Sequence, residues 1–338
     1  MKREVSIAFR VGTLSSLIMT LAMTAHAEMN EITIAQQHGI GYLPLMIMED
    51  KNLLEKYANN EGLSEIKINW RKFAGSNVAN EALLSGNLQF AAVGVPPLIT
   101  MWAKTRDGLG VKGVAALNSM PFFLNTRSSH IRSIDDFTST DKIALPAVKV
   151  SLQAVTLQMA ASERFGEDQA NRFDSLTVSM SHPDGMAALL SGRGEINNHF
   201  TTPPFQYQEL LTPGIRTIIN SYDVMGGPTT FVVVWTTSKF RDENPRTYRA
   251  FLRALSESIN LINEDKRAAA KTYIRMSQSK ETEQFILEML NNPDIKFTIT
   301  PEKVMKYAEF MYKVGSIKVK PSSWRELFFP EIHHLPGS

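Results

Sequence analysis

The stretch Glu31-Ile-Thr-Ile-Ala-Gln-Gln-His-Gly-Ile-Gly-Tyr-Leu-Pro-Leu45 contains a strand, a loop with two glycines and the start of a helix. Polar and apolar side chains alternate over residues 31–35, which is the pattern of a strand. Beyond the loop at residues 39–44, the apolar residues Leu45, Met48 and Leu53 fall at helical spacing. A strand followed by a loop and a helix is the repeating unit of parallel α/β layers. The stretch therefore predicts an α/β fold.

The same unit recurs in two series along the chain. The first series continues with strands predicted at residues 66–70, 89–93 and 111–117, and with helices at 78–84 and around Met101. The second series begins near residue 120. Its strands are predicted at residues 142–145, 175–179, 195–200 and 216–220, and its helices at 151–165 and 185–190. After a β-prone stretch at residues 229–237 the pattern is almost entirely helical, which predicts a tail without a sheet of its own.

This order of elements favours a chain that crosses twice between two lobes. We expect a discontinuous first lobe of residues 28–120 and 228–338, and a second lobe of residues 121–227. The crossings are predicted near residues 119–126 and 221–230, with Gly226-Gly227-Pro228 at the return. Two consecutive domains are the alternative, but the helical tail would then need a core of its own and has almost no strands to build one.

The first 27 residues have the pattern of an export signal. Lys2, Arg3 and Arg10 give a positive start, and the apolar run at residues 11–23 is too short to span a bilayer. Ala25-His26-Ala27 has the small-x-small pattern of a cleavage site. The alternative, a buried N-terminal helix, would show a polar face that this run lacks. We therefore predict export to the periplasm, with cleavage after Ala27.

Composition argues against several classes of function for the mature chain. Removing the 27 residues of the signal from 338 leaves 311, and it removes three basic residues and one acidic one, so the formal net charge falls from +2 to about zero. A neutral chain gives no electrostatic support to nucleic-acid binding. The sequence has no cysteine, which excludes disulfides, thiol nucleophiles and cysteine metal sites. After the signal, no apolar stretch reaches the length of a membrane span.

Several stretches of the chain together carry a resemblance to a known family. They are residues 34–45, Phe73-Ala-Gly-Ser76, Ala82-Leu-Leu-Ser-Gly86, Phe90-Ala-Ala-Val-Gly-Val-Pro-Pro97, Asp135-Asp-Phe137, Lys142-Ile-Ala-Leu-Pro146 and Asp184-Gly-Met-Ala-Ala-Leu-Leu-Ser-Gly192. In this order, and after an export signal, they resemble the nitrate, sulfonate and taurine class of periplasmic solute-binding proteins, the NitT/TauT or SsuA-like group.

The resemblance implies a type II periplasmic-binding-protein fold. Such a fold has two lobes, each a mostly parallel sheet flanked by helices, joined by two hinge crossings. It closes on one small molecule and delivers it to the permease subunits of an ABC transporter. The resemblance also implies a monomer without a cofactor and without enzymatic activity. The implied ligand is a small organic anion, such as a sulfonate, taurine, nitrate or a related nitrogen- or sulfur-containing compound.

Three alternatives stay open from the sequence. The ligand can instead be a thiamine-pyrimidine precursor or an aromatic acid, and the chain can be an exported ligand sensor module. An enzyme is the third alternative, because a fungal thiamine-pyrimidine synthase shares this fold. That enzyme carries a cysteine-rich motif, and the absence of cysteine from this chain weighs against synthesis.

The ligand site is expected where several loops follow strands. Ligands of open α/β sheets lie beyond the carboxyl ends of the strands, where helix N-termini offer free N–H groups to anions and polar groups. Loops at residues 36–42, 75–77, 94–97 and 149–151 meet this description. A strand end at residues 199–202 and the turn at the return crossing complete the expected cleft. The predicted ligand-binding residues are Gln37, His38, Tyr42, Gly75, Ser76, Asn77, Val95, Pro96, Lys149, Ser151, His199, Thr201 and Gly226.

Several of these residues also have a purely structural interpretation. Ser76 can cap its helix, Tyr42 can pack in the core, Lys149 can be solvent-exposed and Gly226 can serve only as a hinge.

Three further features are interpreted as structural. We interpret His182-Pro183-Asp184 as a turn before a helix, with Asp184 as the N-cap. We expect Trp235 in the core of the first lobe, because it alternates with apolar neighbours in a strand. The adjacent His333 and His334 lack a third ligand, so no metal site is predicted.

Overall fold

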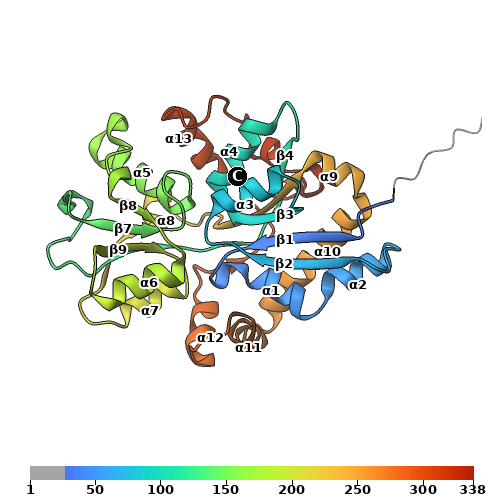
Figure 1. Ribbon diagram of the computed structural model, residues 1–338, viewed down its shortest axis with the longest axis horizontal. Helices are drawn as coiled ribbons and strands as arrows, with labels where there is room; N and C mark the ends of the chain where they lie inside the picture. Colours follow the sequence, from blue (N-terminus) through green and yellow to red (C-terminus); the bar gives the residue numbers. More distant parts are fainter. Residues whose placement is uncertain (1–26) are drawn as a thin grey trace, which may run out of the picture.

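The computed structural model describes residues 27–338; residues 1–26, which hold nearly all of the predicted signal, lie outside the described residues. Figure 1 shows two lobes side by side along the long axis, each built around its own sheet with helices on both faces. The predicted α/β fold class is confirmed. Within residues 27–338, no helix combines the length and the apolar character that crossing a membrane requires.

Five strands form the sheet of the first lobe, in the order β2-β1-β3-β11-β4. Their bounds are Lys67–Lys72 for β2, Glu31–Gln36 for β1, Phe90–Gly94 for β3, Val232–Thr237 for β11 and Val111–Ala116 for β4. Strand β1 pairs parallel with β2 and β3, whereas β11 pairs antiparallel with β3 and β4. Four strands therefore run in one direction and β11 runs in the opposite one.

The sheet of the second lobe repeats this arrangement, in the order β10-β6-β9-β7-β8. Its strands are β10 (Arg216–Asn220), β6 (Phe123–Thr126), β9 (Ile196–Thr201), β7 (Lys142–Leu145) and β8 (Thr177–Ser179). Strand β7 pairs parallel with β8 and β9, whereas β6 pairs antiparallel with β9 and β10. Here β6 is the one strand that opposes the other four.

The opposed strand of each sheet is the first strand after a crossing between the lobes. The other strands end with their carboxyl ends toward the facing lobe, so a chain that leaves one lobe enters the next from the cleft side. Its first strand in the new lobe must then run away from the cleft. This constraint explains why β6 and β11 are antiparallel to their neighbours in mostly parallel sheets.

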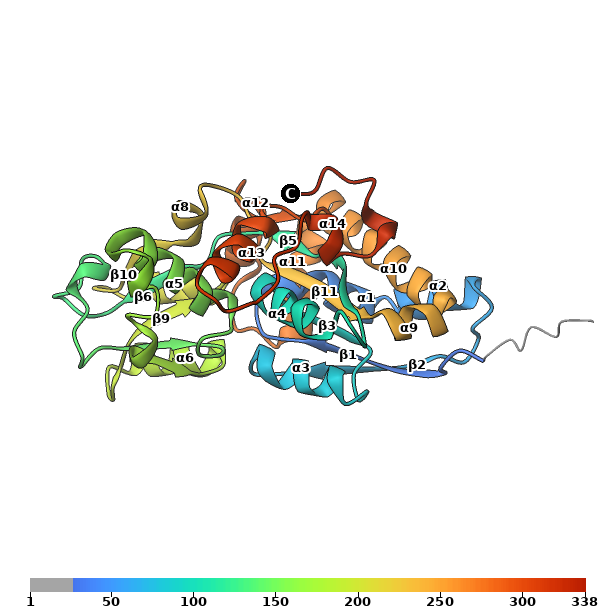
Figure 2. The same cartoon turned by 90° about the horizontal axis from the view of Figure 1, so that it is seen from above.

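Helices cover both sheets, and most of them belong to the first lobe (Figures 1 and 2). The first-lobe helices are α1 (Leu43–Asp50), α2 (Leu53–Asn60), α3 (Ser76–Leu84), α4 (Val95–Thr105), α9 (Ser238–Glu243), α10 (Pro245–Glu264), α11 (Lys266–Ser277), α12 (Glu283–Asn291), α13 (Val304–Lys313) and α14 (Trp324–Leu327). The second-lobe helices are α5 (Leu152–Phe165), α6 (His182–Ser191), α7 (Phe205–Leu210) and α8 (Ser221–Met225). Short 3-10 turns lie at Ile40–Tyr42, Ile134–Asp136, Glu167–Gln169, Asp174–Leu176 and Pro330–Ile332.

The helical tail completes the core of the first lobe. Strand β11 is inserted between β3 and β4, and α10 packs against α1 and α2. Phe90 of β3 stacks on Phe251 of α10, with ring centroids 4.0 Å apart and planes within 8°. Trp235 of β11 is fully buried, as its alternation with apolar residues predicts. The tail therefore shares the first sheet and does not form a domain of its own, while the residue boundaries of the lobes stay predictions.

Two buried segments cross between the sheets and lie antiparallel beside each other. Asn118 holds them together, because its carbonyl accepts from Phe231 N at 3.1 Å and its Oδ1 accepts from Val232 N at 3.2 Å. Its Nδ2 donates to Gly41 O at 2.5 Å. Next to it, Ser119 Oγ donates to Thr229 O at 2.9 Å. The crossings thus form one hydrogen-bonded hinge.

The sequence does not predict three short strands. They are β5 (Asn118–Ser119), β12 (Lys296–Phe297), which pairs with β5, and β6. Strands β5 and β12 have two residues each, too few to show an alternation of polar and apolar side chains, and β6 lies in the stretch that the sequence analysis takes as a crossing between the lobes.

We expect Asn118→Ala to lower the free energy of unfolding by about 2–4 kcal/mol, because it leaves the buried Gly41 O and Val232 N without these partners. Urea unfolding followed by circular dichroism measures the change. Asn87→Ala is the control, since Asn87 is exposed and donates only to Ser85 Oγ, and it should stay within about 0.5 kcal/mol of the parent protein. Equal stability of the two variants would contradict the role of Asn118 in the hinge.

Candidate functional site

A small cavity of about 20 Å³ lies where the two lobes meet. Both lobes contribute to its wall through segments that follow strands β1, β2, β3, β7 and β8, together with Phe231 from the return crossing. Its lining residues are Gln37, Tyr42, Ser76, Gly94, Pro97, Pro146, Ser151, Leu152, Gln153, His182 and Phe231. The cavity therefore lies at the carboxyl ends of the parallel strands, where the sequence analysis places the site.

Four helices point their N-termini at this cavity. Ser76 is the first residue of α3, Gly94 is the N-cap of α4, Ser151 is the N-cap of α5 and His182 is the first residue of α6. The first turn of a helix has N–H groups without intrahelical partners and carries partial positive charge. Two such helix ends from each lobe give the cavity a positive potential without any lysine or arginine in its wall.

Two buried polar side-chain atoms in the wall have no hydrogen-bond partner. Ser76 Oγ is one of them. The N-cap of α3 is Gly75 and Ser76 is the first residue of the helix, so the capping interpretation of Ser76 is wrong. Gln37 Nε2 is the other, while Tyr42 Oη donates to Gln37 Oε1 at 3.2 Å. Burial raises the pKa of Tyr42 well above its usual value, so its hydroxyl keeps the proton that it donates. Ser76 and Gln37 thus offer two free donors to a ligand.

The second lobe supplies the opposite wall through the starts of α5 and α6. Ser151 Oγ accepts from Ala154 N at 3.2 Å, so Ser151 caps α5 and also lines the cavity. Helix α6 begins at His182 and is capped by Ser181, whose Oγ accepts from Asp184 N at 3.3 Å. The sequence-based N-cap assignment of Asp184 is therefore wrong by three residues.

His182 is one of the lining residues that the predicted set lacks, together with Pro146, Leu152, Gln153 and Phe231. It is buried, and it lines the cavity as the first residue of α6. The sequence analysis interpreted His182-Pro183-Asp184 as a turn before a helix, because the proline and a capping residue account for it locally.

Three of the predicted residues lie next to the cavity wall. His199 and Thr201 are fully buried in β9 behind His182. His38 is half-buried outside the cavity, and its pKa is lowered by burial and then by the neighbouring Lys72.

Other predicted residues lie farther from the cavity. Asn77 is exposed on α3, and Val95 and Pro96 are buried in α4 while Gly94 and Pro97 line the wall instead. Gly226 is the C-cap of α8, and its carbonyl accepts from Lys303 Nζ at the hinge. Their roles in ligand binding stay predictions.

Lys149 is not one of the residues that line the inter-lobe cavity. It is exposed and borders an outer pocket together with Val148, Gln158, Asp174 and Ser316. Its φ of 66° lies in the left-handed region that favours glycine. The backbone at Lys149 therefore has the left-handed conformation that glycine usually adopts.

The lobes touch through backbone on both sides of the cavity. A Cβ on Gly75 would lie 2.6 Å from Pro146 O, and a Cβ on Gly94 would lie 2.7 Å from Leu152 Cβ. Ile40 N also donates to Pro203 O at 3.0 Å across the cleft. The volume of this cavity fits about one water molecule, whereas sites for organic ligands are typically about 300–1,000 Å³. A ligand can therefore enter only when the lobes separate.

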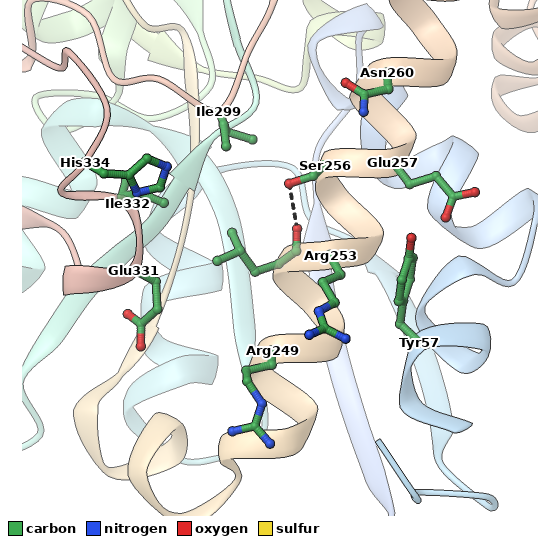
Figure 3. Close-up of a pocket in the computed structure, with 11 residues that line it drawn as sticks. Tyr57, Arg249, Arg253, Ser256, Glu257, Asn260, Ile299, Glu331, Ile332 and His334 are labelled. Atoms are coloured by element: carbon green, nitrogen blue, oxygen red, sulfur yellow. Dashed lines mark hydrogen bonds between the residues drawn. The ribbon is translucent and has the colours of Figure 1, made fainter. Parts of the chain in front are cut away.

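A larger groove of about 710 Å³ lies on the first lobe alone, between α2, α10 and the C-terminal segment (Figure 3). Its charged side chains are already paired: Arg249 with Glu61 at 2.8 Å, and Glu257 with Lys56 at 2.8 Å. Ser256 Oγ donates to a carbonyl within α10. None of the described residues that line this groove has a buried polar side-chain atom without a partner. The inter-lobe cavity is therefore the better candidate.

A family model described as the NMT1-like family matches residues 25–276. The chain belongs to the NMT1-like family. It is 23% identical over 309 residues to a putative aliphatic sulfonates-binding protein of Bacillus subtilis (strain 168). This alignment covers 87% of this chain and 85% of the relative.

Several solved structures share the fold of this NMT1-like protein. The alkanesulfonate-binding protein SsuA from Xanthomonas axonopodis pv. citri, bound to MOPS, has a TM-score of 0.67 at 16% identity, covering 86% of this chain and 95% of that one. The periplasmic nitrate-binding protein NrtA from Synechocystis PCC 6803 has a TM-score of 0.62 at 13% identity, covering 85% and 81%. The predicted periplasmic-binding-protein fold and the resemblance to the SsuA-like group are confirmed.

We expect Gly75→Ala to hold the lobes apart, because its φ of −151° suits alanine but the new methyl group meets Pro146 O. An overpacked contact costs about 1–3 kcal/mol, so affinity for a test ligand such as ethanesulfonate should fall roughly tenfold by isothermal titration calorimetry. Gly108→Ala, where the nearest atom lies 4.0 Å from the added Cβ, should bind as the parent protein does. Unchanged affinity in Gly75→Ala would show that ligand binding does not require this contact.

Proposed function

We propose that this chain is the substrate-binding component of an ABC importer, and that it captures a small organic anion between its lobes. The observation that carries the proposal is the convergence of four helix N-termini and two unpaired buried donors on one inter-lobe cavity. Lobe separation admits the ligand, and closure surrounds it with hydrogen-bond donors. The closed lobes then present the ligand to membrane permease subunits as a monomer.

The chemistry of the wall supports an anion in particular. The lining residues include no carboxylate that could hold a cationic ligand, and they include donors from Ser76, Gln37 and the helix ends. Anions bind at helix N-termini through backbone N–H groups and the helix dipole, without a basic side chain. The names of the Bacillus relative and of the Xanthomonas structure, with its bound sulfonate buffer, support a sulfonate as the first ligand to test.

A binding role is favoured over catalysis by the state of the nucleophilic side chains. Ser151 is used as a helix cap and Ser76 has no base as partner, so neither hydroxyl is activated. The chain has no cysteine. Tyr42 and Phe231 give the wall two aromatic faces, which keep a pyrimidine precursor or an aromatic acid as the competing ligand.

We expect ethanesulfonate at about 100 times its Kd to stabilise the protein by about 2.7 kcal/mol, which raises Tm by about 5 °C. Differential scanning fluorimetry against a panel of ethanesulfonate, taurine, nitrate, benzoate and a hydroxymethylpyrimidine measures this shift. The proposal fails if no anion of the panel raises Tm, and a shift with the pyrimidine alone would favour the competing ligand.

The free donor of Ser76 offers a direct test of the site. Loss of a hydrogen bond to an anion costs about 1.5–3 kcal/mol, so Ser76→Ala should weaken ethanesulfonate binding roughly 10- to 100-fold. Ser85→Ala, an exposed serine just beyond the same helix, is the matched control and should change nothing. Deleting the gene and measuring cellular uptake of labelled ethanesulfonate then separates an importer component, whose loss abolishes uptake, from an exported sensor.

The periplasmic location is part of the proposal. Cleavage after Ala27 would leave Glu28 as the first residue, and its carboxylate accepts from Arg246 N and Thr247 N at 2.8 Å at the start of α10. We expect N-terminal sequencing of the exported protein to begin at Glu28. An exported chain that still begins at Met1 would contradict the predicted processing.

A further inference from the structure

A chain of buried side chains runs from the cavity into the second lobe behind His182. On the cavity side, Gln153 Nε2 lies 3.5 Å from His182 Nε2. On the inner side, His182 Nδ1 lies 3.0 Å from Thr201 Oγ1 and 3.4 Å from His199 Nε2. His199 Nδ1 lies 2.5 Å from Glu209 Oε1. Each of these side chains is more than nine-tenths buried.

This row of buried side chains, from Gln153 to Glu209, contains two imidazoles but one carboxylate. Asn125 Nδ2 donates to the second carboxylate oxygen of Glu209 at 2.8 Å. A fully buried carboxylate is stable when it is paired, and His199 and Asn125 already occupy both oxygens of Glu209. A further proton on His182 would place an uncompensated positive charge in the interior. The balance of charges therefore keeps His182 neutral in the ligand-free protein.

The charged and titratable groups around His182 act in the same direction. Burial, followed by His199 and then His38, lowers the pKa of His182 well below its usual range. His38 itself faces Lys72, which lowers its pKa, and Asp184, which raises it. Among the buried side chains that lie in a row behind His182, the one carboxylate is that of Glu209, which is already paired with His199.

We propose that His182 takes up a proton when an anion enters the cavity, so that the ligand's negative charge compensates the new imidazolium. The inference rests on the proposed function, and it adds a pH-dependent affinity and a charge requirement for the ligand. His182 is placed for this role because it lines the cavity wall, while its Nδ1 faces the buried His199–Glu209 pair.

The sign of the pH dependence follows from linkage. A bound anion raises the pKa of His182 above its value in the free protein, so binding takes up a proton and is favoured by acid. Affinity therefore increases as pH falls between the bound-state and the free-state pKa, by at most about tenfold per pH unit for one proton. A neutral ligand provides no compensating charge, and its affinity should not vary with pH in this range.

The first experiment needs no ligand. Ring ¹⁵N chemical shifts of the histidines are recorded from pH 8 to pH 5 by NMR, with His182→Gln identifying the signals of His182. We expect His182 to stay neutral in the free protein over this range. Titration of His182 near its ordinary pKa of about 6.5 in the wild-type protein would overturn the inference, whether or not a ligand is known.

The second experiment measures protons taken up on binding. Ethanesulfonate is titrated calorimetrically at pH 7 in phosphate and in Tris, whose ionisation enthalpies differ, and affinity is measured again at pH 6 and pH 8. We expect uptake approaching one proton in the wild-type protein and none in His182→Gln, which keeps a hydrogen-bonding side chain but cannot titrate. His334→Gln, on the first-lobe groove, is the control and should behave as the wild type does.

The outcomes separate this inference from the proposed function. Ethanesulfonate binding that takes up no proton and has the same affinity at all three pH values would overturn the inference and leave anion binding intact. If neither ethanesulfonate nor any other anion of the panel binds between pH 5 and pH 8, both proposals fail. If His182→Gln does not fold, the proton count and the histidine shifts of the wild-type protein still decide the question.

Discussion

The structure depends on one hydrogen-bonded hinge in which two chain crossings lie side by side. Asn118 uses its backbone carbonyl and both ends of its side chain there, and Ser119 ties the same segment to the return crossing. Because the chain returns through this point, β11 is inserted into the middle of the first sheet and the tail helices finish the first core. Both sheets then point the carboxyl ends of their parallel strands at the same space.

That common orientation makes the site. Helix N-termini follow the strands, so two sheets that face each other bring helix ends from both lobes to one cavity. The two walls differ in kind. The first lobe offers the unpaired donors of Ser76 and Gln37, whereas the second lobe offers His182 with the buried His199–Glu209 pair behind it. Backbone contacts at Gly75 and Gly94 set how closely the walls approach.

The sequence predicted most of the elements and part of the site. Alternation and helical spacing located β1, β2, β3, β4, β7 and the tail helices because those elements are long enough to show a period. Loops after strands led to Gln37, Tyr42, Ser76 and Ser151, which do line the cavity. The same reasoning missed His182 because Ser181 and Pro183 account for the turn locally. It also placed Lys149 in the site, since a position after a strand does not reveal which way its side chain points.

By itself the sequence determined the α/β class and the doubling of the strand-loop-helix series, because periodicity is a local property; export to the periplasm stays a prediction. Only the tertiary structure decided which polar groups are left unpaired and which histidine meets the cavity. These depend on contacts between residues that are not neighbours in the sequence, such as Gly75 with Pro146 and His182 with His199. Burial makes these contacts important for ligand binding, because an unpaired donor or an uncompensated charge is costly where water is excluded.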